Sequence, residues 1–98
     1  MDAALVFCEV FMENNKQNGT RVAIISIIVE NPDSVAEINE ILHQASDMII
    51  GRMGIPYRQK GISIISVVVD AEQEKISAVS GKLGRIDGVN AKTIYSKK

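Results

Sequence analysis

Two apolar segments of this chain repeat each other forty positions apart, and this repeat constrains the fold more than any other feature. Residues 24–30 read IISIIVE, and residues 64–70 read IISVVVD. Both segments are rich in β-branched residues, which favour strands. Because neither segment alternates strictly between apolar and polar positions, each is expected to be covered on both faces. The repeat therefore predicts two central β-strands, one in each half of the chain.

A helix is expected after the first of these strands. Beyond the break at residues 31–33, apolar side chains recur at helical spacing from Val35 to about Met48. Ser34, with Glu37 three residues later, has the form of a capping box, in which both side chains accept free N–H groups of the first turn.

The remaining segments complete a strand-helix-strand pattern in each half. The second helix, capped by Asp70 or by the residues just after it, is expected to end near Gly84. Residues 89–95 form a final strand, and the glycine-rich segment 50–57 forms an edge strand followed by a tight turn. This order predicts an α+β fold, the ferredoxin-like βαββαβ sandwich, with an antiparallel four-stranded sheet and two helices on one face.

Such a sandwich leaves one face of its sheet without helices. Val22, Ile24 and Ile28 are expected on that face, where apolar side chains form an adhesive patch unless a partner covers them. The sequence therefore predicts self-association, as a dimer or a tetramer, through the open sheet face.

Residues 1–20 are interpreted as an N-terminal extension, and residues 21–98 as the domain proper. The extension joins a short apolar run to a polar segment that ends in glycine, which favours a flexible tail or an added edge strand. A further interpretation takes Met12 as the native start. The apolar run is too short for a signal peptide or a membrane span, so no membrane contact is expected. The single cysteine fits a reducing compartment, so a cytoplasmic location is expected.

Composition argues against several kinds of function. The chain has one cysteine, Cys8, and one histidine, His43, so it forms no intrachain disulfide and lacks the ligands of an ordinary zinc site. No catalytic group can be assembled around His43 or Ser34, so neither enzymatic activity nor a cofactor is expected. The chain also lacks a helix-turn-helix, zinc-finger or base-stacking pattern, so direct binding to nucleic acid is not expected.

Charge is distributed unevenly along the chain. The formal net charge is −1, yet residues 1–50 carry −6 and residues 51–98 carry +5. The opposite charges of the two halves can pair within the fold or between subunits, or the basic half can bind an anionic ligand.

Five residues are candidates for binding a small effector. Asn31, Asp33 and Ser34 form the turn before the first helix, where free N–H groups attract anions and polar ligand groups. The competing interpretation of Ser34 is plain helix capping. Arg52 and Arg58 fit either an anion-binding role or solvated charge on an edge strand and its turn.

Several segments resemble the family of iron-only hydrogenase system regulators. These are EILH at residues 40–43, IIGRMGIPYR at 49–58, KGISIIS at 60–66, SGKLG at 80–84, and the pair Gly88-Val89. The resemblance implies an ACT-like domain, similar to the C-terminal domain of nickel-responsive ribbon-helix-helix regulators. Such domains associate and bind small effectors near strand–helix loops at subunit interfaces. The DNA-binding segment of those regulators is absent here, which implies a sensor or adaptor that acts through a partner.

These observations together predict a non-enzymatic regulatory domain of an iron-only hydrogenase system. It is expected to act as a homo-oligomer and to bind a small effector at its strand–helix loops. The alternative is a structural or assembly module that binds no small ligand.

Overall fold

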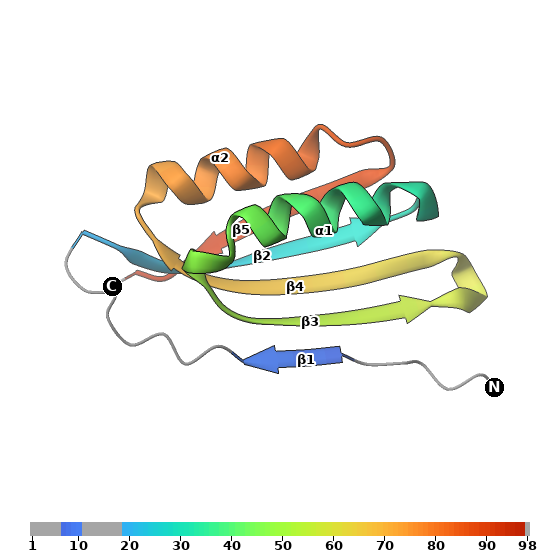
Figure 1. The fold of residues 1–98 in the computed structure, drawn as a ribbon, viewed down its shortest axis with the longest axis horizontal. Coiled ribbons are helices and arrows are strands. Elements are labelled where there is room, and N and C mark those ends of the chain that lie inside the picture. Colours follow the sequence, from blue (N-terminus) through green and yellow to red (C-terminus); the bar gives the residue numbers. More distant parts are fainter. Residues whose placement is uncertain (1–6, 11–18, 98) are drawn as a thin grey trace.

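A five-stranded antiparallel sheet carries two helices on one face in the computed structural model of the chain (Figure 1). The structure describes residues 7–10 and 19–97. The strands are β1 (Phe7–Val10), β2 (Arg21–Val29), β3 (Ile49–Tyr57), β4 (Ile62–Ala71) and β5 (Val89–Tyr95). The helices are α1 (Val35–Gln44) and α2 (Gln73–Gly84), and three short 3-10 helices are η1 (Pro32–Ser34), η2 (Ser46–Met48) and η3 (Arg58–Lys60).

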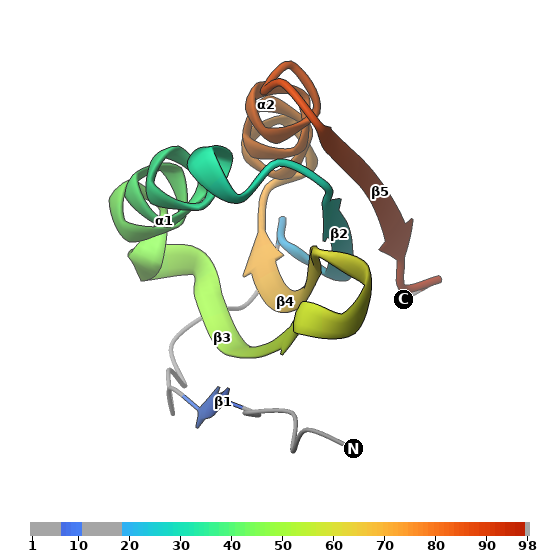
Figure 2. The same ribbon diagram turned by 90° about the vertical axis from the view of Figure 1, so that its right-hand side faces the viewer.

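The strand order is β1-β3-β4-β2-β5, and each neighbouring pair is antiparallel. The two repeated segments lie side by side at the centre of the sheet, where Ser26 is opposite Ser66. Both helices lie on the same side of the sheet (Figure 2). The predicted ferredoxin-like fold is confirmed, with β2-α1-β3 and β4-α2-β5 as its two halves.

The four strands of the predicted sheet are joined by a fifth, β1, which pairs with the outer side of β3. Phe7 is opposite Gly54, and Val10 is opposite Gly51. Along this stretch β3 is therefore an inner strand, which corrects its prediction as an edge strand. The division into an extension and a domain at residue 21 stays a prediction, and Met12 lies outside the described residues.

The capping of both helices and the end of α1 differ from the predictions. The predicted capping box at Ser34 is wrong, since the Ser34 side chain makes no capping bond and instead reaches another turn. Helix α1 ends at Gln44, and Met48 lies in η2. Asp70 belongs to β4, and the residue that precedes α2 is Glu72, whose side chain also makes no capping bond. Helix α2 ends at Gly84, as predicted.

The core lies between the helices and the sheet. In β2, buried Ala23, Ile25, Ile27 and Val29 alternate with exposed residues, because successive side chains of a strand point to opposite faces. The helices contribute buried Ile38 and Leu42 from α1 and Ile76 and Leu83 from α2. All of this packing is on one side of the sheet, which leaves the opposite face open.

Candidate effector-binding site

The turn between β2 and α1, which holds three of the five predicted site residues, is bonded to the turn between α2 and β5. Asn31 Nδ2 donates to Asp87 Oδ2 at 3.2 Å, and Ser34 Oγ donates to the backbone oxygen of Asp87 at 2.7 Å. Asn31 Oδ1 accepts from the backbone N–H of Asp33 at 3.0 Å. Ser34 is buried. These side chains therefore join two turns of the same fold.

Replacing Ser34 with alanine tests this structural role. The change removes a buried donor from the Asp87 carbonyl, so we expect the free energy of unfolding to fall by about 1–2 kcal/mol. Urea unfolding followed by circular dichroism measures the loss. Ser46→Ala, at an exposed position in η2, is the control and should change little; equal stability of the two variants would contradict the assigned role.

A groove lies between α1 and the hairpin formed by β3, η3 and β4, and we call it the α1–β3 groove. It consists of two adjoining cavities of about 180 Å³ and about 160 Å³, which share Val35, Pro56 and Ser63 as lining residues. Ile65 lines the first cavity and Val29 the second. Both of these residues are buried, so the base of the groove is part of the hydrophobic core.

The two predicted arginines lie in this groove, one in each cavity. Arg52 lines the first cavity from the helix-covered face of β3, where its partner in the register is the buried Val67. Its Nη2 donates to Asn39 Oδ1 of α1 at 3.1 Å. Arg58, which begins η3, is exposed and lines the second cavity. On the neighbouring strand β1, Glu9 is opposite Arg52 in the register.

The structure therefore divides the five predicted site residues into two groups. Asn31, Asp33 and Ser34 stabilise the junction of two turns, whereas Arg52 and Arg58 share the groove.

Sequence reasoning did not assign several other residues of the groove to the site. Val35, Asn39, Pro56 and Ser63 were interpreted as parts of helices and strands, and not as parts of a binding site. Val35 and Asn39 are four residues apart on α1, a spacing that places them on one helix face. This spacing can be recognised in the sequence, but only the fold shows that this helix face lies beside β3.

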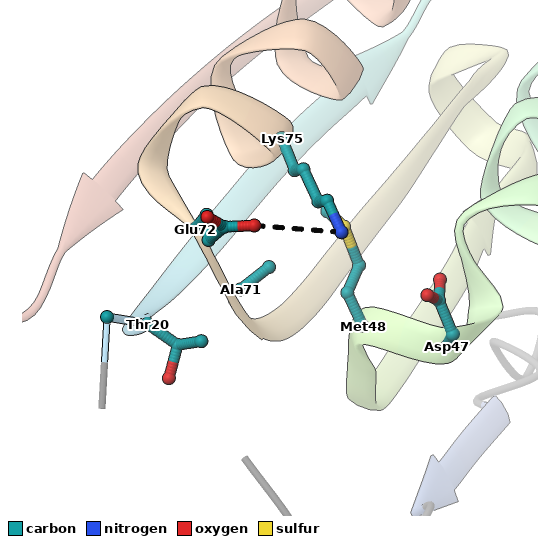
Figure 3. Close-up of a pocket in the computed structure, with 7 residues that line it drawn as sticks. Thr20, Asp47, Met48, Ala71, Glu72 and Lys75 are labelled. Carbon is teal, nitrogen blue, oxygen red and sulfur yellow. Dashed lines mark ion pairs between the residues drawn. The ribbon is translucent and has the colours of Figure 1, made fainter. Parts of the chain in front are cut away.

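Another cavity, of about 260 Å³, opens where α2 begins (Figure 3). Its lining includes Thr20, Asp47, Met48, Glu72 and Lys75. In Figure 3 a dashed line joins Lys75 and Glu72, whose Nζ and Oε1 atoms are 3.8 Å apart. The described lining of this cavity includes none of the five residues predicted to bind an effector, whereas the α1–β3 groove contains Arg52 and Arg58. We therefore take the groove as the candidate site.

Neither a metal-ligand cluster nor a membrane-spanning helix is found in the described part of the chain. It contains no group of three or more His, Cys, Asp or Glu residues placed to hold a metal ion. His43 is exposed on α1. Within residues 7–10 and 19–97, no helix has the length and apolar character needed to cross a membrane.

Comparison with known proteins places this arrangement in a family. Residues 21–93 match the TM1266-like family model, which is described provisionally as an iron-only hydrogenase system regulator. The chain belongs to the TM1266-like family. No curated protein matches the chain.

The TM1266-like chain is also similar to a solved structure, that of the uncharacterized protein TM1266 from Thermotoga maritima. The two are 38% identical, with a TM-score of 0.76, over 80% of this chain and 99% of the other. The resemblance noted in the sequence is confirmed. The TM1266-like match includes both sides of the α1–β3 groove and begins after β1.

Proposed function

We propose that this chain is a non-enzymatic regulatory domain of an iron-only hydrogenase system. It acts as a homo-oligomer, dimer or tetramer, formed through the open sheet face, and it binds a small effector near its strand–helix loops. The description of the TM1266-like family supports the regulatory role. The observation that carries the oligomer is the composition of the open face.

Three rows of residues form the centre of the open sheet face. In cross-strand register they are Gly51-Val68-Ile24-Ile94, Met53-Ser66-Ser26-Lys92, and Ile55-Ile64-Ile28-Asn90. Lys92 is the one charged residue in these rows, and the pair of Val22 and Asp70 continues the face beyond the first row. The most exposed large apolar side chain is Ile94, at 66%, while Ile24, Ile28 and Ile64 are each about two-fifths exposed. An apolar surface that is continuous over four strands is typical of an interaction site.

A second copy of the chain is the partner that best fits this face. Two sheets can pack with nearly aligned strands and interdigitating apolar side chains. The central row contains the small residues Ser26 and Ser66 between two aliphatic rows. Aliphatic side chains of a second copy can therefore fit above the two serines. A face that meets its own copy forms a closed two-fold interface, the commonest arrangement in soluble homo-oligomers.

Sedimentation velocity of the purified chain at micromolar concentration tests the self-association. We expect a dimer or tetramer for the native sequence and a monomer for the double variant Ile24→Lys/Ile64→Lys, because two buried lysines without partners oppose the interface. Ala36→Lys, at an exposed position on α1, is the matched control and should keep the native mass. A monomeric native chain, or an unchanged mass in the double variant, would count against the proposed oligomer.

A structural or assembly module without a ligand is the second candidate. The observation that favours it is that Asn31 and Ser34 are bonded to Asp87 within the fold. Thermal-shift measurements with amino acids, carboxylic acids, nucleotides and divalent metals distinguish the two. A saturable rise in melting temperature supports the sensor, whereas a stable oligomer that responds to none of these compounds supports the module.

A further inference from the structure

We propose that the outer edge of β3, at residues 51–54, is a docking site for an extended peptide of a partner protein, in which an acidic residue lies between apolar residues. Strand β1 of the same chain, with the sequence FCEV, occupies this edge and has that composition. It is therefore an internal competitor of the partner peptide. The inference goes beyond the regulatory function proposed above, because the edge of β3 is separate from the open sheet face.

Strand β1 is an addition to the domain that the family shares. The family match covers residues 21–93 and leaves out β1. The match to the TM1266 structure spans 99% of that chain but 80% of this one, so this chain has residues for which TM1266 has no counterpart. In the part that matches the family, β3 is the last strand on its side of the sheet.

An edge strand presents a row of backbone N–H and C=O groups to any extended segment that reaches it. Peptides bind to sheets in this way, through main-chain hydrogen bonds that supply affinity and side chains that supply specificity. In Figure 1, β1 lies along β3 at the end of the sheet, in antiparallel register with residues 51–54. Among the five described strands, β1 pairs with β3 alone, so its release breaks no other strand pair.

The sequence of β3 limits the length of the site. Gly51 and Gly54 are opposite Val10 and Phe7, at the two ends of the paired segment. A glycine in an edge strand is stabilised by a large residue, especially an aromatic one, on the strand beside it. Two residues beyond Gly54, Pro56 has no N–H group, and prolines in strands are found where this missing donor faces a sheet edge. The site therefore fits a short segment with bulky residues at both ends.

Charge fixes the register of the added strand. Glu9 is directly opposite Arg52, and opposite charges at such positions attract each other across a sheet. The Arg52 guanidinium is oriented by its bond from Nη2 to Asn39 Oδ1, at 3.1 Å. A shift by one residue would put the acid opposite Gly51 or Met53, and it would move every side chain of the added strand to the other face. We therefore expect an acid at this position in a partner peptide.

Binding of a labelled peptide to the full chain tests the proposal. The probe has the sequence of residues 5–12, with Cys8→Ser to prevent oxidation and a fluorescein group for anisotropy. The receptor variant Cys8→Pro/Glu9→Pro disables the internal strand. Because the N–H groups of successive residues point to opposite sides of a strand, one of the two prolines removes a donor to β3. Asn14→Pro/Asn15→Pro, outside β1, is the matched control.

We expect saturable binding of the probe by Cys8→Pro/Glu9→Pro. Binding by the native chain and by the control should be at least about tenfold weaker, because their own β1 competes for the edge. A probe with Glu9→Lys should bind the double-proline receptor about fivefold more weakly, and Arg52→Glu in that receptor should reverse the preference. Absence of saturable binding, equal binding by the native and double-proline chains, or an unchanged preference in the Arg52→Glu receptor would overturn the proposal.

Amide hydrogen exchange of the full chain keeps the proposal testable if the double-proline variant does not fold. Glu9→Lys puts like charges opposite each other, so the amides of residues 51–54 that point toward β1 should exchange about two- to fivefold faster. Amides of the inner strand β4 should be unchanged, and Glu9→Lys/Arg52→Glu should restore the native rates. Equal rates at residues 51–54 in all three chains would contradict the register and, with it, the docking site.

Discussion

Ile25→Ala is expected to lower the free energy of unfolding by about 3–5 kcal/mol, the upper part of the range for large-to-small changes at buried aliphatic positions. Ile25 has no exposed surface and lies in β2, between β4 and β5 and beneath the helices. Removing three carbon atoms there leaves a cavity that two neighbouring strands prevent from closing. Because native domains are stable by about 5–15 kcal/mol, this single change should remove a large part of the total stability.

Ile24→Ala is the matched control, since it changes the same residue type one position earlier in the same strand. Ile24 is 39% exposed on the open sheet face, so its loss from a single copy of the chain should cost about 1 kcal/mol or less. Urea unfolding at several protein concentrations measures both variants. A large, concentration-independent cost for Ile24→Ala would contradict the assignment of its side chain to the open face.

Gly88→Ala is expected to lower the free energy of unfolding by about 2–4 kcal/mol, the combined cost of a left-handed backbone and of overpacking. Gly88 has a φ of +72°, and a β-carbon added there would lie 2.7 Å from Asn31 Cβ and 3.0 Å from the Asn31 backbone nitrogen. The Glu30 N–H donates to the Gly88 oxygen at 2.7 Å, so the two turns cannot easily separate to make room.

Gly61→Ala separates the two causes of that loss. Gly61 has a φ of +65°, yet a β-carbon there would meet no atom within 4 Å. It should therefore show the backbone cost alone, about 1–2 kcal/mol. Thermal and urea unfolding give the difference between the variants, which is the cost of the contact with Asn31. If Gly61→Ala were as destabilising as Gly88→Ala, the close approach at Asn31 would have no energetic role.

The fold could be predicted because its central feature is local in sequence. The apolar runs at residues 24–30 and 64–70 indicated buried strands, and the helical spacing after each strand indicated the helices. The capping of α1 could not be predicted, because Ser34 bonds to Asp87, which is 53 residues away in the chain. A capping box is a local motif, and here a distant backbone oxygen takes the hydroxyl group instead.

The site could be predicted only in part, and for a related reason. Arg52 and Arg58 were singled out because their charge was not required by the predicted strand and turn. The groove that contains the arginines is also lined by Val35 and Asn39, which come from α1. Their position beside β3 depends on how the helix lies across the sheet, which no local sequence pattern specifies.

The order of strands also has a consequence for synthesis of the chain on the ribosome. The hydrogen-bonded neighbours of β2 are β4 and β5, and both follow it in the sequence. When α1 and β3 have been made, the apolar strand β2 still has neither partner. One edge can pair once β4 has been made, but the other stays unpaired until the last strand, Val89–Tyr95, leaves the exit tunnel. An unpaired apolar strand is prone to aggregate, so the interval between synthesis of β2 and of β5 is the time when the nascent chain most needs protection.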